Sequence, residues 1–143
     1  MSLKNYVLSI LIIPALLSAA LSRTQPLIID HNCENLAHIP QNWIDAAQEN
    51  LKWHYAHTSH GGQLTTGLQR IEKSDAAYSQ ARSSSSLPDE EGALCIFDGQ
   101  ESDTYISPNE YWETKNGMDK TRAVLDNNPS INISQWSWCR QVD

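Results

Sequence analysis

The sequence predicts an α/β fold with a parallel sheet, and two observations support that prediction. Along the chain, apolar residues switch between the period of two that is typical of strands and the longer period of helices. The elements read in this way follow in the order helix, strand, helix, strand, helix, strand. This is the order of a parallel sheet whose strands are joined by crossover helices. The expected strands lie near 51–57, 93–97 and 131–138.

The stretch 51–68 contains the clearest change of period. Its first half alternates apolar and polar side chains in the manner of a strand, with one face formed by Leu51, Trp53 and Tyr55. Its second half begins an amphipathic helical stripe, formed by Leu64, Leu68 and Ile71. We therefore expect a strand, a short polar turn with two glycines, and a helix near 63–73.

Local signals predict further elements on both sides of this stretch. A helix is expected from Pro40 through Asn50, because proline is favoured at the first helical position and an apolar stripe follows it. The apolar run 93–97 fits a buried strand that is closed by a turn. Residues 76–91 have the composition of a loop, and no strand or helix is expected there.

A capping box marks the last expected helix. Residues 107–110 read Ser-Pro-Asn-Glu, with the proline at the first helical position. We expect one helix from about 108 to 126, weakened in its middle by Gly117. In the strand that follows, Trp136 and Trp138 share a face. We expect them to pack in the core rather than to form an exposed platform for a sugar.

The first 22 residues have the pattern of a secretory signal peptide. Lys4 precedes a short apolar run, 6–17, and small residues follow it. The run is too short and too interrupted to predict a membrane span. We therefore expect cleavage between Ala20 and Ser22, a mature chain that is secreted or held at the cell surface, and no membrane association after cleavage.

Length, charge and cysteine count limit the remaining possibilities. The chain has 143 residues and a formal net charge of −7, which suits one domain with a single core. The acidic balance argues against nucleic acid as a partner. The odd number of cysteines would leave one over if two formed a disulfide in an exported protein; they are Cys33, Cys95 and Cys139.

The turn after the first strand contains the candidate catalytic residues His57, Ser59 and His60. In open α/β sheets, ligands bind at the carboxyl ends of the strands, and a helix that begins there offers free N–H groups to an oxyanion. Ser59 could therefore be a nucleophile, or Thr58 and Ser59 could instead cap the following helix. The two histidines and Asp98 could hold zinc, but the spacing does not favour this, and no metal or cofactor is expected.

Several of these stretches resemble one group of proteins. Residues 53–67 read Trp-His-Tyr-Ala-His-Thr-Ser-His-Gly-Gly-Gln-Leu-Thr-Thr-Gly. They are similar to the opening of exported microbial proteins within or near the SGNH/GDSL-hydrolase superfamily. The segments 111–114 and 136–139, which read Tyr-Trp-Glu-Thr and Trp-Ser-Trp-Cys, resemble the same group. The similarity extends from about residue 40 to residue 143.

The resemblance implies a flavodoxin-like three-layer α/β/α sandwich with a nucleophilic serine after the first strand, at Ser59. It also implies an oxyanion-stabilising side chain after a later strand, at Gln141. Two features depart from the superfamily's pattern, because His57-Thr58 replaces Gly-Asp before the serine and the closing Asp-x-x-His block has no counterpart. We therefore expect residues 23–143 to be the N-terminal part of such a domain, and residues 1–143 by themselves to lack the general base and to be inactive.

Three classes of function remain open. The first is a secreted esterase that acts on a small-molecule ester or an acylated carbohydrate through Ser59. The second is a non-catalytic module of the same fold that binds a glycan or a surface polymer, and the third is a structural surface domain. The surroundings of Ser59 distinguish the first class from the others, and the exposure of Trp136 and Trp138 distinguishes the second from the third.

Overall fold

The computed structural model describes residues 30–33 and 35–139. The chain divides into two compact units, Met1–Glu34 and Asn35–Asp143. In the first unit, the described part contains one 3-10 turn, η1 (His31–Cys33). The expected signal peptide, residues 1–22, lies outside the described residues. Within the described ranges, no helix combines the length and the apolar character that a membrane crossing requires.

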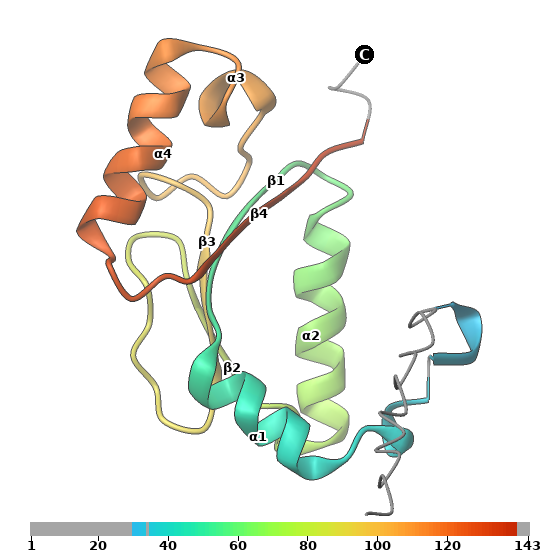
Figure 1. The fold of residues 1–143 in the computed structure, drawn as a ribbon. Coiled ribbons are helices and arrows are strands. Elements are labelled where there is room, and N and C mark those ends of the chain that lie inside the picture. Colours follow the sequence, from blue (N-terminus) through green and yellow to red (C-terminus); the bar gives the residue numbers. More distant parts are fainter. Residues whose placement is uncertain (1–29, 34, 140–143) are drawn as a thin grey trace, which may run out of the picture. The chain divides into compact units, whose positions relative to one another are not determined.

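The second unit is built on a sheet of four parallel strands, which confirms the predicted fold class. The strands are β1 (Lys52–His57), β2 (Gln80–Ser83), β3 (Leu94–Asp98) and β4 (Ile133–Ser137). Their order across the sheet is β2-β3-β1-β4 (Figure 1). Trp53 of β1 lies opposite Ile96 of β3 and Ile133 of β4, so the three strands expected from the sequence all pair in parallel.

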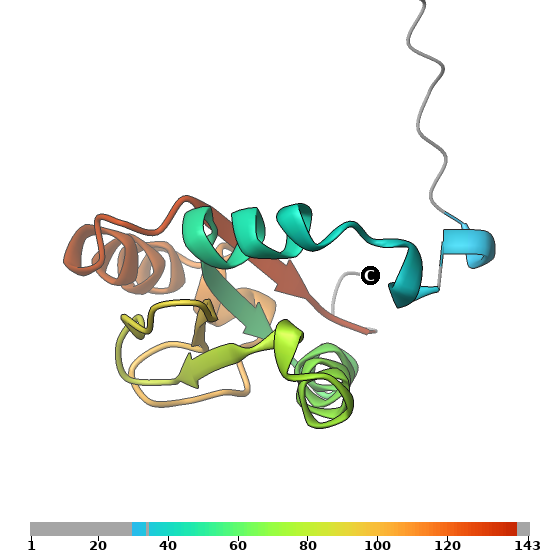
Figure 2. The same cartoon turned by 90° about the horizontal axis from the view of Figure 1, so that it is seen from below.

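Helices cover both faces of this sheet, as in a flavodoxin-like α/β fold. Its helices are α1 (Gln41–Asn50), α2 (Gly62–Ser74), α3 (Pro108–Tyr111) and α4 (Lys115–Asn127), with short 3-10 turns η2 (Leu36–His38) and η3 (Ala76–Tyr78). Figures 1 and 2 show α2 on one side of the sheet and α3 and α4 on the other. Successive side chains of β1 point to opposite faces of the sheet and contact the helices on each face. Tyr55 bonds to Gly61 at the start of α2, and His54 stacks on Tyr111 of α3.

The core lies on the two central strands, β1 and β3. Residues 54–58 of the chain are all buried, and so are residues 95–100. Tyr55, Cys95 and Ile96 have no exposed surface. Parallel strands that are covered by helices on both faces are expected to be buried along their whole length in this way. Because both strands are packed on two sides, the residues that follow them are held in fixed positions.

The strand β2 was not predicted, because residues 76–91 have the composition of a loop. It is a short edge strand that tertiary contacts hold in place. The carboxylate of Glu72 in α2 accepts hydrogen bonds from the backbone N–H and the side-chain amide of Gln80, both at 3.1 Å. Ala81 is buried. Such contacts override a weak local preference for extended structure.

The expected single helix over 108–126 is also wrong, because the segment forms two helices. The capping box is present, and the Ser107 N–H donates to Glu110 at 3.1 Å. However, α3 ends at Tyr111, and Thr114 starts α4 by accepting a hydrogen bond from the N–H of Gly117 at 2.9 Å. Gly117 therefore lies in the first turn of α4, where a Cβ would overlap the carbonyl of Asn109.

Two helical glycines should respond to alanine in opposite directions. At Gly67, in the middle of α2, an added Cβ has no heavy atom within 4 Å. Gly67→Ala should therefore stabilise the protein by about 0.5–1 kcal/mol, through helix propensity alone. Gly117→Ala should destabilise it by about 1–3 kcal/mol, because two backbone segments must separate. Urea unfolding of both variants measures the difference, and two changes of the same sign would contradict this account.

Candidate functional site

The carboxyl ends of the parallel strands meet at one edge of the sheet, where ligands bind in open α/β folds. Strand β1 ends at His57, β2 at Ser83 and β3 at Asp98. Two groups of side chains gather at this edge. One surrounds Ser59 in the turn before α2, and the other consists of His57, Arg82 and Asp98.

The turn after β1 exposes Ser59 beside unused backbone donors. Thr58 is fully buried, and its N–H donates to Ser137 of the neighbouring strand at 3.2 Å. Ser59 and His60 are exposed, and α2 begins at Gly62. Among the described residues, no hydrogen bond uses the backbone N–H of Ser59, His60 or Gly61. These groups belong to the N-cap residue and to the two residues before it, at the positive end of the α2 dipole, and they suit a negatively charged oxygen.

The Ser59 side chain is not occupied in capping α2. The N-cap residue is Gly61, and no side chain caps the helix there. The Ser59 Oγ lies 4.0 Å from the Cys139 Sγ. Ser59 also lines an open hollow of about 700 Å³ together with α2 residues: Gly62, Gln63, Thr66, Gly67 and Arg70. The hydroxyl is therefore placed to meet a molecule in this hollow.

The described structure gives no hydrogen bond between Ser59 and His60, and it does not describe Gln141. His60 is exposed, and no hydrogen bond among the described residues joins Ser59 to a histidine. Gln141, the expected oxyanion donor, lies outside the described residues.

His57 is placed away from Ser59, in a buried ion pair. Only 7% of its surface is exposed. Its Nδ1 donates to the carbonyl of Thr58 at 2.9 Å, and its Nε2 lies 2.8 Å from the Asp98 Oδ1. Because both ring nitrogens are engaged, His57 cannot accept a proton from Ser59 in this arrangement. A Cβ on Gly61 would overlap the His57 ring, so glycine is required where the turn crosses it.

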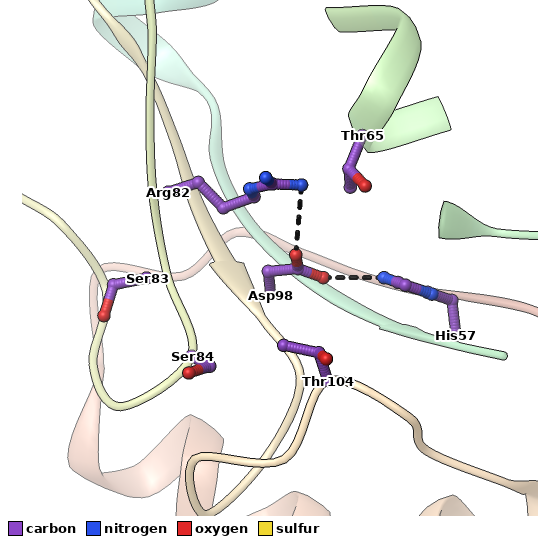
Figure 3. Close-up of a pocket in the computed structure, with 7 residues that line it drawn as sticks. All are labelled: His57, Thr65, Arg82, Ser83, Ser84, Asp98 and Thr104. Carbon is purple, nitrogen blue, oxygen red and sulfur yellow. Dashed lines mark hydrogen bonds and ion pairs between the residues drawn. The ribbon is translucent and has the colours of Figure 1, made fainter. Parts of the chain in front are cut away.

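Arg82 completes this second group. Its Nη1 lies 3.4 Å from the Asp98 Oδ2, so each oxygen of the buried carboxylate faces a different cation (Figure 3). Together with four hydroxyl residues, the three side chains line a pocket of about 490 Å³; the hydroxyl residues are Thr65, Ser83, Ser84 and Thr104. Arg82 was missed because β2 was read as loop. Recognition of 80–83 as a strand would have placed it at the same edge.

The pKa of His57 is raised by its surroundings. Burial alone lowers the pKa, but the hydrogen bonds to Asp98 and to the Thr58 carbonyl, with the Asp98 charge, outweigh it. The direction agrees with the geometry, since each ring nitrogen faces an acceptor oxygen and the doubly protonated ring satisfies both contacts. His60 does not join His57 and Asp98, and within the described part of the chain no three His, Cys, Asp or Glu side chains are grouped to hold a metal ion.

His54, on the opposite face of β1, is shifted the other way. It is fully buried, and burial lowers its pKa despite the hydrogen bond to the Gly99 carbonyl. The Nε2 donates to that carbonyl at 3.2 Å, and the Nδ1 accepts from the Ser134 hydroxyl at 2.8 Å. This pattern satisfies a neutral imidazole with one proton.

The two tryptophans at the end of the last strand form a stack in which Trp136 is exposed and Trp138 is half-buried. Trp136 and Trp138 stack with ring centroids 4.4 Å apart and planes 12° from parallel. Trp136 is 49% exposed, which contradicts the prediction that it packs in the core. Trp138 is fixed by its Nε1, which donates to the carbonyl of Ile106 at 2.8 Å. The stack presents a flat aromatic face near the carboxyl edge.

Comparison with models of known protein families gives no match, and comparisons with curated proteins and with solved structures give no match either. Function is therefore inferred from the residues and geometry at the carboxyl ends of the strands.

The two buried histidines should give the protein a stability maximum near pH 6.5, the ordinary pKa of histidine. The folded-state pKa of His57 is raised, so its contribution is complete below pH 6.5 and is lost as the pH rises through that raised value. The folded-state pKa of His54 is lowered, so its contribution is complete above pH 6.5 and is lost as the pH falls. Each loss amounts to about 1.4 kcal/mol per unit of pKa difference.

Single substitutions should separate the acid-side loss of stability, assigned to His54, from the alkaline-side loss, assigned to His57. His57→Gln should flatten the decline on the alkaline side, and His54→Gln should flatten the decline on the acid side. The measurement is the free energy of unfolding in urea between about pH 5 and 8, compared by slope rather than by absolute value. A wild-type profile without a maximum in this range would show that the two rings do not titrate as described.

Proposed function

We propose that the protein is a secreted ester hydrolase of the SGNH/GDSL type, with Ser59 as nucleophile and a small-molecule ester or an acylated carbohydrate as substrate. The observation that carries the proposal is the exposed Ser59 hydroxyl beside the unused N–H groups at the start of α2. The serine follows the central strand of a parallel sheet, at the edge where such folds bind ligands. Export is proposed from the first 22 residues.

Acyl transfer needs an anion-stabilising environment more than any other single feature. When the Ser59 Oγ attacks an ester carbonyl, negative charge develops on the carbonyl oxygen. The backbone N–H groups of Ser59, His60 and Gly61 have no other partner among the described residues, so they are free to donate to that oxygen. Their fixed position on the turn that leads into a 13-residue helix supplies the preorganisation that such stabilisation requires.

The turn also leaves space for a substrate to approach. Gly61 and Gly62 have no side chains, and the hollow beside Ser59 is lined by small or polar residues from one face of α2. The acyl-enzyme would form as the alcohol leaves, and water would then release the acid.

A general base must take the proton of the Ser59 hydroxyl. His57 does not suit this role. Both ring nitrogens of His57 are engaged by Thr58 and Asp98. We propose that the base is another histidine, by analogy with the triads in which it faces the serine from a separate segment. His60, exposed in the same turn, is the alternative within the described residues.

A second candidate function is a non-catalytic module that binds a glycan. The exposed stack of Trp136 on Trp138 favours it, because sugars pack their apolar faces on flat aromatic rings. In this case Ser59 would have no chemical role.

Turnover of an activated acetyl ester distinguishes the two functions. With protein expressed from the complete native gene, Ser59→Ala should lower kcat for p-nitrophenyl acetate by about 10³-fold or more. Thr66→Ala is the control, since Thr66 lines the same hollow but lies one turn further along α2, and it should retain most of the activity. His60→Gln tests the alternative base. Equal turnover by wild type and Ser59→Ala would remove the nucleophile assignment and favour the glycan-binding module.

A further inference from the structure

The pocket around His57, Arg82 and Asp98 has no role in the chemistry proposed for Ser59. Strands β1, β2 and β3 each contribute one of its charged side chains. The beginning of α2 separates it from the other hollow, because Thr65 lines this pocket and Thr66 lines the hollow beside Ser59. Its volume of about 490 Å³ is within the range of pockets for small molecules. It is therefore a separate place at which a ligand can bind.

Arg82 has N–H donors that no described residue uses. Its single ion pair among the described residues joins Nη1 to the Asp98 Oδ2 at 3.4 Å, whereas a guanidinium carries five N–H groups in a rigid fork. The side chain is 24% exposed, and Figure 3 shows it extending across the pocket toward Thr65. A planar fork with free donors matches the paired oxygens of a carboxylate or a phosphate.

The charge of the pocket favours an anion although it contains a carboxylate. Among the described residues that line it, Asp98 alone is acidic, and both of its oxygens already face cations. Both ring nitrogens of His57 face acceptor oxygens, so the charged, doubly protonated ring satisfies its two contacts. The three side chains together therefore carry one net positive charge in a partly buried site, where water screens charge less than at the surface.

The other four lining residues each carry a hydroxyl group. Thr65, Ser83, Ser84 and Thr104 contribute these groups from α2, from the end of β2 and from the loop after β3. Two of these hydroxyls also bond inside the protein, since that of Thr65 donates to the carbonyl of Gly62 at 3.1 Å and that of Ser83 accepts from the Ser85 N–H at 3.2 Å. Hydroxyls donate and accept hydrogen bonds, so they suit a ligand that itself carries several hydroxyl groups. We propose that this pocket binds a hydroxylated oxyanion, a sugar acid or a sugar phosphate, whose anionic group is bound by the free side of the Arg82 guanidinium.

Calorimetric titration of the intact protein with matched sugars tests the proposal. Glucuronate and glucose 6-phosphate carry the two forms of the anion, and glucose is the neutral control. At least one of the two anions should bind measurably at millimolar concentration, and glucose should bind more weakly than either. The stronger of the two anions identifies the form of the ligand. If neither anion binds more tightly than glucose, the proposal is wrong.

Two variants place the binding at Arg82. Arg82→Gln should weaken binding of the preferred anion about tenfold or more, as expected for loss of hydrogen bonds to a charged group. Arg82→Lys keeps a cation beside Asp98 but loses the fork, so it should fold and still bind more weakly than wild type. Arg122→Gln is the matched control, because Arg122 forms an ion pair of similar length, 3.3 Å, on the exposed surface of α4. Wild-type affinity in both Arg82 variants would overturn the assignment.

Discussion

The contact between His57 and Asp98 is the interaction on which the arrangement of the carboxyl edge depends. It joins the ends of β1 and β3 at 2.8 Å, and Arg82 adds the end of β2 through the second carboxylate oxygen. Both His57 and Asp98 are almost fully buried. A buried charge is tolerated only when it is paired in good geometry, so neither ring nor carboxylate can move without exposing an uncompensated charge. The three strand ends are therefore held together by electrostatics as well as by the sheet.

This fixed ring also determines how the chain leaves β1. The turn must pass directly over His57, and only a residue without a side chain fits there, which is why Gly61 precedes α2. The hydroxyl of Tyr55 donates to the carbonyl of Gly61 at 3.2 Å from the same side. Because Gly61 packs against Tyr55 and His57, Ser59 lies on the solvent side of the turn. A histidine that looks catalytic in the sequence thus acts as the support of the turn that carries the serine.

The sequence predicted the elements that bury apolar surface with a regular period. Strands β1, β3 and β4 and helix α2 each have such a pattern, and all were placed within a few residues. Strand β2 was not found, because its contacts come from other elements, with β3 pairing along it and Glu72 of α2 binding Gln80, and Arg82 was missed with it. The break between α3 and α4 was missed because Thr114 can be read as a helix interior residue as well as a cap. The sequence placed Asp98 beside His57 only as a possible metal ligand, because neighbouring strands end at one edge of the sheet. It did not predict that the two side chains form an ion pair, or that the carbonyl of Thr58 binds the second ring nitrogen.

The stacked tryptophans are connected to the same edge by the backbone of Ile106. Its N–H donates to the carbonyl of His57 at 2.8 Å, and its carbonyl accepts from the Trp138 Nε1 at 2.8 Å. The position of the aromatic stack is thus tied to the end of β1, which also carries Ser59. Because aromatic faces orient a sugar without hydrogen-bonding its reactive groups, glycan binding and ester hydrolysis need not be exclusive. In the proposed hydrolase, the stack would hold the carbohydrate and the turn would meet its acyl group, so removal of Trp136 would weaken substrate binding while leaving the chemistry of Ser59 intact.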